Sequence, residues 1–254
     1  MTKPEQGPVC SDDAPPELRT FGRRRGRKLS PKQQALLDEL LPRIAIDMTR
    51  PAGADQLGPT NHELSDQELS DHELSDQELW LEVGFGGAEH LLWQAEHNPH
   101  VRLIGCEPFE DGVVKALTGI EQRGLGNIRL HADDARPLIR WLPTASLARC
   151  FILYPDPWPK RRHIKRRLVS PAILAALARI MRPGAELRIG TDIGDYARTV
   201  LLAMAASPHF AWQATSAADW RVRPPDWPQT RYEAKAVREG RRSTYLLFRR
   251  TAAP

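Results

Sequence analysis

Cysteine is scarce in this sequence, and long apolar segments are missing. The three cysteines, Cys10, Cys106 and Cys150, are widely spaced and form no Cys-x-x-Cys pair. This pattern argues against a disulfide framework and a zinc site, and it fits a reducing cytoplasm. No apolar run reaches the roughly 20 residues that span a bilayer, and the N-terminal segment lacks the apolar core of a secretory signal. We therefore expect a cytoplasmic protein without a membrane partner.

The composition is that of a globular protein. Hydrophobic residues make up 41% and charged residues 27% of the 254 positions, which argues against wholesale disorder. This length allows one large domain with appendages. The histidines follow no spacing typical of metal ligands, so we expect no metal ion. Monomer and homodimer are both compatible with the sequence.

Charge is distributed unevenly along the chain. Residues 61–80 contain seven acids and no Lys or Arg, so the rest of the chain is more basic than the net charge of +4 suggests. The basic residues cluster at 23–28, 160–167 and 238–250. Such clusters are typical of proteins that bind a phosphate backbone, although many basic segments are only solvated surface.

The chain divides into four parts. Residues 1–28 read as a disordered tail and a basic arm, which is either an RNA clamp or a solvated segment. Residues 29–60 form a helix, opened by Ser30-Pro31, and a linker. Residues 61–79 repeat HELSD and QELSD with a period of five, which matches neither helix nor strand, so we expect a disordered insert. The folded domain is expected at 80–250.

Short apolar segments alternate with helical segments in this domain, which indicates βαβ units and an α/β fold. The expected sheet is mostly parallel, has helices on both faces and ends in an antiparallel strand. The expected strands are 79–83, 101–108, 127–135, 149–154, 185–195 and 244–249, with helices at 89–96, 113–120, 172–181 and 195–205.

A glycine turn, Gly84-Phe85-Gly86, lies between the first strand and its helix. Glycines there permit a tight turn and close approach of a ligand to the backbone. The third glycine of a dinucleotide-binding motif is replaced by Glu89, whose charge suits a pyrophosphate poorly. The turn therefore favours a ligand without phosphates, such as S-adenosylmethionine.

Acidic residues end three successive strands. Glu82 could face the cations of S-adenosylmethionine, Glu107 its ribose hydroxyls, and Asp133 or Asp134 its adenine amino group. A single acid at a strand end is more often solvated than functional. Three at one edge of a sheet favour a binding site.

The segment LYPDPWPK follows the fourth strand and forms a stiff loop, because three prolines fix φ and remove backbone donors. The loop presents Asp156, Trp158 and Lys160 at the edge where open α/β sheets bind ligands. Trp158 either stacks on a base or packs the loop. Six of the eight residues from Lys160 to Arg167 are Lys or Arg.

Six segments together resemble the bacterial tRNA (guanine-N7-)-methyltransferases over about residues 20 to 250. PDPWPK and TRYE are specific to that family, whereas the glycine turn is shared by class I methyltransferases. Bacterial members usually have glycine where Ala88 stands. The segments are LEVGFGGAEHLL, IGCEPF, HADDA, LYPDPWPKRRHIKRR, GTDIGDY and PPDWPQTRYEAKA.

The resemblance implies a seven-stranded, Rossmann-like methyltransferase that uses S-adenosylmethionine to form 7-methylguanosine in the variable loop of tRNA, usually at nucleotide 46. It implies cofactor contacts at Glu82, Glu107, Asp134 and Asp156, beside the glycine turn. It implies substrate contacts at Lys160, Asp192, Thr230, Arg231, Tyr232 and Glu233. It implies RNA contacts at Arg162, His163, Ile164, Lys165, Arg166 and Arg167.

The role of Asp156 follows from the chemistry of guanine. N7 is an acceptor and carries no proton, so no base is needed before methylation. We expect Asp156 to hold the guanine and to stabilise the positive charge that methylation creates. Three alternatives remain: an NAD-dependent oxidoreductase, a methyltransferase acting on another RNA, and a non-catalytic RNA-binding module.

Overall fold

The computed structural model describes residues 24, 26, 28–58 and 77–252. Most of the predicted tail and of the acidic insert therefore lies outside the described residues. Leu79, at the end of the predicted insert, is the first residue of a strand. No helix in the described part of the chain is long and apolar enough to cross a membrane.

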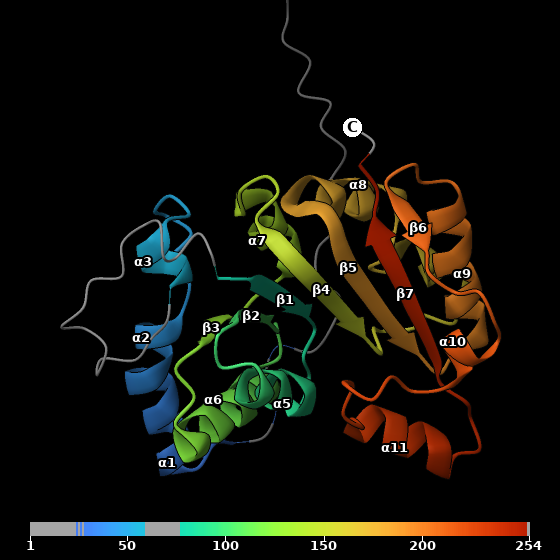
Figure 1. Ribbon diagram of the computed structural model, residues 1–254. Coiled ribbons are helices and arrows are strands. Elements are labelled where there is room, and N and C mark those ends of the chain that lie inside the picture. Colours follow the sequence, from blue (N-terminus) through green and yellow to red (C-terminus); the bar gives the residue numbers. More distant parts are fainter. Residues whose placement is uncertain (1–23, 25, 27, 59–76, 253–254) are drawn as a thin grey trace, which may run out of the picture.

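A seven-stranded sheet in the order β3-β2-β1-β4-β5-β7-β6 forms the centre of the molecule (Figure 1). β1 to β5 are parallel, whereas β7 pairs antiparallel with both β5 and β6. The expectation of a mostly parallel sheet with an antiparallel last strand is confirmed. The strands are β1 (Leu79–Val83), β2 (Arg102–Cys106), β3 (Ile128–His131), β4 (Leu147–Leu153), β5 (Met181–Thr191), β6 (Phe210–Trp212) and β7 (Thr244–Arg250).

Helices cover both faces of the sheet (Figure 1). One face carries α7 (Ala135–Trp141), α8 (Pro171–Ile180) and α9 (Gly194–Ala205). The other carries α5 (Glu89–His97) and α6 (Glu110–Arg123). Short helices are α3 (Ala54–Leu57), α10 (Ala218–Arg221), α11 (Arg231–Arg238) and the 3-10 helix η3 (Arg161–Arg166).

The central strands are buried on both faces, and successive side chains enter different cores. In β1, Leu79, Leu81 and Val83 pack with α7, α8 and α9, whereas Trp80 packs with α5 and α6. All five residues of β1 are buried. Burial on both faces explains why every residue of this strand except Glu82 is apolar, in place of an alternating pattern.

The N-terminal helix begins where the sequence predicts. Ser30 is its N-cap: its side chain accepts the N–H of Gln33, and the side chain of Gln33 accepts the N–H of Ser30, which together form a capping box. The helix continues through α1 (Pro31–Ala35), the π-helical segment η1 (Leu36–Leu40) and α2 (Leu41–Ile44). It packs beside α6 at the β3 edge of the sheet (Figure 1).

Six of the described elements were not predicted from the sequence: α3, α7, η3, β6, α10 and α11. β6 has only three residues, two of them exposed, so it carries no apolar run. α7 contains Pro137, a residue usually read as a helix breaker. α10 and α11 lie in the Pro-rich and Arg-rich segment before β7, and α11 buries only Glu233 and Ala236. Short or polar elements have no periodicity long enough to detect.

Gly112, in the first turn of α6, lies close to the glycine turn. A Cβ at this position would be 2.5 Å from the carbonyl oxygen of Gly86 and 2.9 Å from Cγ of Glu107. Contacts this short would require backbone to move. The absence of a side chain at Gly112 therefore lets α6 approach the end of β1.

We expect Gly112→Ala to lower the free energy of unfolding by about 1 to 3 kcal/mol, because it overpacks a backbone contact. Denaturant unfolding measures the change. Gly119→Ala, in the same helix, is the matched control. Its Cβ would meet only the side chain of Leu92, which can rotate, and alanine is favoured over glycine in a helix by about 1 kcal/mol. Equal losses in the two variants would contradict this explanation.

Candidate active site

A cavity of about 320 Å³ lies at the carboxyl edge of the sheet. Its walls are the residues that follow β1, β2, β3 and β4, together with Tyr232 of α11. It brings together seven residues that the sequence assigned to cofactor, substrate or RNA on separate segments. These are Gly84, Gly86, Glu107, Asp134, Asp156, Arg166 and Tyr232.

The turn after β1 depends on left-handed backbone conformations. Gly84, Gly86 and Ala88 have φ of 74°, 55° and 64°. The N–H of Gly84 donates to the carbonyl oxygen of Cys106 at 2.8 Å, which fixes the turn to β2. A Cβ on Gly86 would lie 2.8 Å from the ring of Tyr232. Glycine at this position therefore lets α11 close over the turn.

Glu107 is 7% exposed and lines the cavity at the end of β2. Its two carboxylate oxygens accept hydrogen bonds from the N–H of Gly86 at 2.8 Å and the N–H of Phe109 at 2.9 Å. Burial raises the pKa of Glu107, and the two N–H donors oppose that rise. Each oxygen retains a further lone pair, so the carboxylate can still accept hydroxyl groups of a ligand.

Asp134 also lines the cavity, but its carboxylate has other partners. It is the N-cap of α7 and accepts the N–H of Arg136 at 2.8 Å. Its second oxygen pairs with the guanidinium of Arg136 at 2.6 Å. A ligand amino group would therefore meet a carboxylate already held in place. The neighbouring Asp133 pairs with Arg24 at 2.8 Å and lies outside the cavity lining.

The loop after β4 holds Asp156 at the cavity wall. Tyr154 and Trp158, on either side, have φ of 50° and 42°, conformations that are strained for residues with a Cβ. The hydroxyl of Tyr154 donates to Ser243 at 2.9 Å, and the guanidinium of Arg166 lies 5.0 Å above the ring of Trp158. Burial by the surrounding protein raises the pKa of Asp156.

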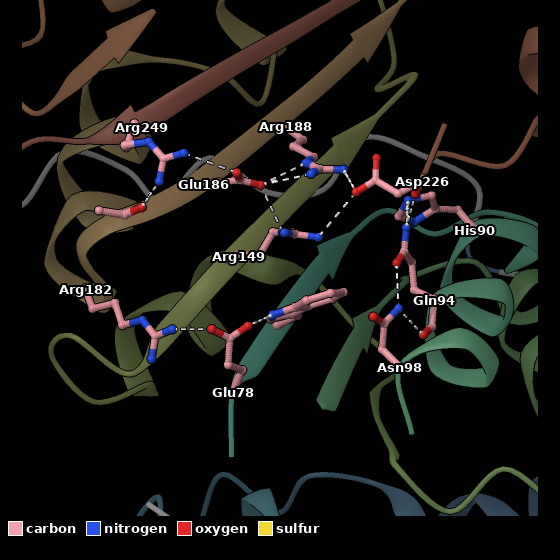
Figure 2. A network of polar contacts seen from close by, with 12 residues as sticks. Glu78, His90, Gln94, Asn98, Arg149, Arg182, Glu186, Arg188, Asp226 and Arg249 are labelled. Atoms are coloured by element: carbon pink, nitrogen blue, oxygen red, sulfur yellow. Dashed lines mark hydrogen bonds and ion pairs between the residues drawn. The ribbon is translucent and has the colours of Figure 1, made fainter. Parts of the chain in front are cut away.

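Glu82 does not line the cavity. It is 3% exposed, and its carboxylate accepts a hydrogen bond from Nδ1 of His90 at 2.8 Å. The amide nitrogen of Gln94 lies 3.1 Å from Nε2 of His90 and donates to the carbonyl oxygen of Asp226 at 2.7 Å. Because that nitrogen is a donor, Nε2 of His90 accepts and Nδ1 carries the proton. Figure 2 shows His90, Gln94 and Asp226 in this chain of contacts.

Of the residues 230–233 that were predicted to contact substrate, only Tyr232 lines the cavity. Thr230 is the N-cap of α11 and accepts the N–H of Glu233. Arg231 pairs with Glu89 at the start of α5. The carboxylate of Glu233 is buried and accepts the hydroxyl of Tyr245 at 2.6 Å.

Asp192 and Lys160 also lie outside the cavity lining. The carboxylate of Asp192 pairs with Arg241 at 2.6 Å. Lys160 is exposed and precedes the first residue of η3.

Most of the basic tract 160–167 lies on η3, and its side chains differ in their exposure. Arg162, Ile164 and Lys165 are exposed, and His163 is half-buried against Trp158. Arg166 turns toward the cavity. Arg167 is 4% exposed and its guanidinium is bonded inside the protein. The tract therefore does not present a single cationic surface, and the predicted contact of Arg167 with RNA does not agree with its burial.

Some cavity residues were missed by sequence reasoning. Phe109 and Arg136 each lie two residues after an acid that was identified at a strand end, so position was the available signal. Tyr154 lies in the loop motif in which Asp156 received the attention, and Leu168 directly follows the basic tract. In the described part of the chain, no cluster of three or more metal-ligating side chains is present.

Comparison with known proteins identifies the family. Residues 76–246 match a family model described as "Putative methyltransferase". The chain is 47% identical over 91% of its length to a tRNA (guanine-N(7)-)-methyltransferase of Nitrobacter hamburgensis, of which it covers 86%. It is 44% identical over 92% to one of Rhodospirillum rubrum (88% covered), and 48% identical over 87% to one of Hyphomonas neptunium (94% covered).

Among solved structures, the chain is similar to a 16S rRNA (adenine(1408)-N(1))-methyltransferase mutant from Catenulisporales acidiphilia, with 15% identity and a TM-score of 0.49 over 72% of this chain and 89% of that one. The resemblance read from the six sequence segments is confirmed by the curated relatives and the family model. The chain belongs to the tRNA (guanine-N(7)-)-methyltransferase family.

Proposed function

We propose that this protein transfers a methyl group from S-adenosylmethionine to N7 of a guanine in the variable loop of tRNA, forming 7-methylguanosine. The observation that carries the proposal is the convergence of Glu107, Asp156 and Tyr232 on one cavity beside the glycine turn. The relatives are named for the same reaction on tRNA. The protein is thus an S-adenosylmethionine-dependent enzyme.

The cavity suits a nucleoside without phosphates. Glu89, at the start of the helix that follows the glycine turn, is paired with Arg231, so this helix end does not offer bare N–H groups to an anion. Glu107 has acceptor capacity left for ribose hydroxyls, and Asp134 has a fixed carboxylate for the adenine amino group. Phe109 adds an aromatic wall.

Other predicted cofactor contacts differ in how directly they reach the cavity. Gly84 and Gly86 line it and allow close approach to the backbone. Glu82 lies behind the turn in its contact with His90. We propose that it acts through the position of that turn. The cofactor supplies the electrophilic methyl group.

Asp156 holds the guanine in this scheme. N7 carries no proton, so the carboxylate is free to accept N1–H and the exocyclic amine of the base. Methylation places a positive charge on the purine, and a fixed carboxylate stabilises it more in the transition state than before. Tyr232 lies across the cavity and limits the space in which the base can lie. The rest of the rate enhancement comes from the placement of N7 against the methyl group.

The remaining substrate and RNA contacts are proposed for the surface around the cavity. Arg162, His163, Ile164, Lys165 and Arg166 lie on η3, where exposed cations can meet tRNA phosphates. Lys160, Asp192, Thr230, Arg231 and Glu233 lie on loops and helix ends outside the cavity lining, and we propose that they contact the tRNA around the target base.

The direct test is methyl transfer from labelled S-adenosylmethionine to unmodified tRNA, followed by chemical cleavage at 7-methylguanosine. We expect one cleavage site in the variable loop. Label incorporated without cleavage there would contradict the proposed position and favour another RNA target. Binding without any transfer would favour a non-catalytic RNA-binding module.

Asp156→Asn is expected to keep the fold, because the amide has the shape of the carboxyl, and to lower kcat by about 100-fold or more through the loss of the negative charge. Single-turnover methylation of tRNA measures the effect. Asp38→Asn, on the surface of η1, is the control for a lost surface charge. A rate near that of the wild-type protein in Asp156→Asn would exclude this role.

Binding of S-adenosylhomocysteine should weaken on acidification at a higher pH than ordinary carboxyl groups would cause. Burial raises the pKa of both Glu107 and Asp156, so both lose their charge above the usual carboxyl range of about 4. Calorimetric titration between pH 4 and about 8 measures the affinity. In Glu107→Gln, the affinity should fall less on acidification than in the wild-type protein. An unchanged fall in that variant would show that another group causes the pH dependence.

A further inference from the structure

Arg167 differs from the rest of the basic tract in where its side chain lies. It is 4% exposed, whereas Arg161, Arg162 and Lys165 are exposed. η3 ends at Arg166, and the extended backbone of Arg167 follows it. This change of direction turns the side chain of Arg167 from the surface into the space between the Asp156 loop and α9.

The guanidinium of Arg167 joins these two elements. Nε donates to the carbonyl oxygen of Pro157, the residue after Asp156, at 2.9 Å. The other two nitrogens reach the first turns of α9, where they bond the carboxylate and carbonyl of Asp195 and the hydroxyl of Thr199. The guanidinium also lies 5.2 Å above the ring of Tyr196. One side chain therefore binds a loop carbonyl and a helix at the same time.

The Asp156 loop needs an external attachment. Pro155, Pro157 and Pro159 have no N–H with which the loop could bond itself. Tyr154 and Trp158 are held at positive φ, and such conformations persist only where the surroundings over-determine them. The hydrogen bond from Arg167 is the attachment at the centre of the loop, one residue from the carboxylate.

We propose that Arg167 is a positioning residue, which fixes Asp156 against α9 and does not contact RNA. Only the expected effect on kcat rests on the proposed methyl transfer. Arginine suits this position because the three nitrogens of its planar guanidinium can bond several acceptors at once in a buried site. Lysine carries the same charge but has a single nitrogen, so it cannot replace all of these bonds.

The first variants to compare are Arg167→Met, which keeps the apolar stem, and Arg167→Lys, which keeps the charge. For both we expect kcat for tRNA methylation to fall by about 10- to 100-fold, the loss typical of a misplaced reacting group. S-adenosylhomocysteine should bind more weakly. Amide hydrogen exchange at Asp156, Trp158 and Lys160 should become faster, without any ligand present.

The salt dependence of tRNA binding separates positioning from RNA contact. Each phosphate contact adds about 0.7 to 0.9 to the slope of log K against log salt. Arg167→Met should leave this slope unchanged. Lys165→Met is the matched control from the exposed side of η3, and it should lower the slope by about that amount while keeping the affinity for S-adenosylhomocysteine.

The results that would overturn the inference are definite. If Arg167→Met lowers the salt slope and leaves loop exchange and kcat as in the wild-type protein, Arg167 contacts RNA. If that variant does not fold, Thr199→Val removes one anchor alone, and wild-type loop exchange in Thr199→Val would refute the positioning role. If the wild-type protein methylates no tRNA, the proposed function fails, but loop exchange and S-adenosylhomocysteine binding still test Arg167.

Discussion

The carboxylate of Glu107 fixes the two turns on which the cavity is built. It joins the N–H of Gly86, after β1, to the N–H of Phe109, after β2. Gly112 lets α6 press against both Gly86 and Glu107. Because both oxygens are bonded before a ligand arrives, the carboxylate is preorganised, and little ordering remains to be lost on binding. Any displacement of the Glu107 carboxylate would therefore move the turn after β1 and the turn after β2 together.

A second set of charged contacts places α11. Arg149 and Arg188 lie between Glu186 and Asp226 on the face of β4 and β5 (Figure 2). Asp226 is held through its carboxylate by Arg188 at 2.8 Å and through its carbonyl by Gln94. Ion pairs that are partly exposed add little stability. These contacts fix the position of Asp226. Because the segment after Asp226 leads directly to Thr230 and Tyr232, they also fix the position of α11.

The sequence predicted those features that repeat along the chain or end a strand. The five parallel strands, the closing antiparallel strand and the cavity position of Glu107, Asp134 and Asp156 could be read from apolar runs followed by acids. The direction of individual side chains could not. Arg166 and Arg167 are identical neighbours in the sequence, yet one lines the cavity and the other is buried. Their separation depends on where η3 ends, which no local pattern records.

The same limit applies to Glu82 and Glu233. Both are acids in the segments that resemble the family, and both are buried and bonded to His90 and Tyr245 respectively. Methylation at N7 needs no proton transfer, so a site for it gains rate from placement and fixed charge. Glu82 and Glu233 hold the turn after β1 and α11 in place without lining the cavity. A charged residue in a motif is therefore not by itself evidence of contact with a ligand, and its burial distinguishes a contact residue from a supporting one.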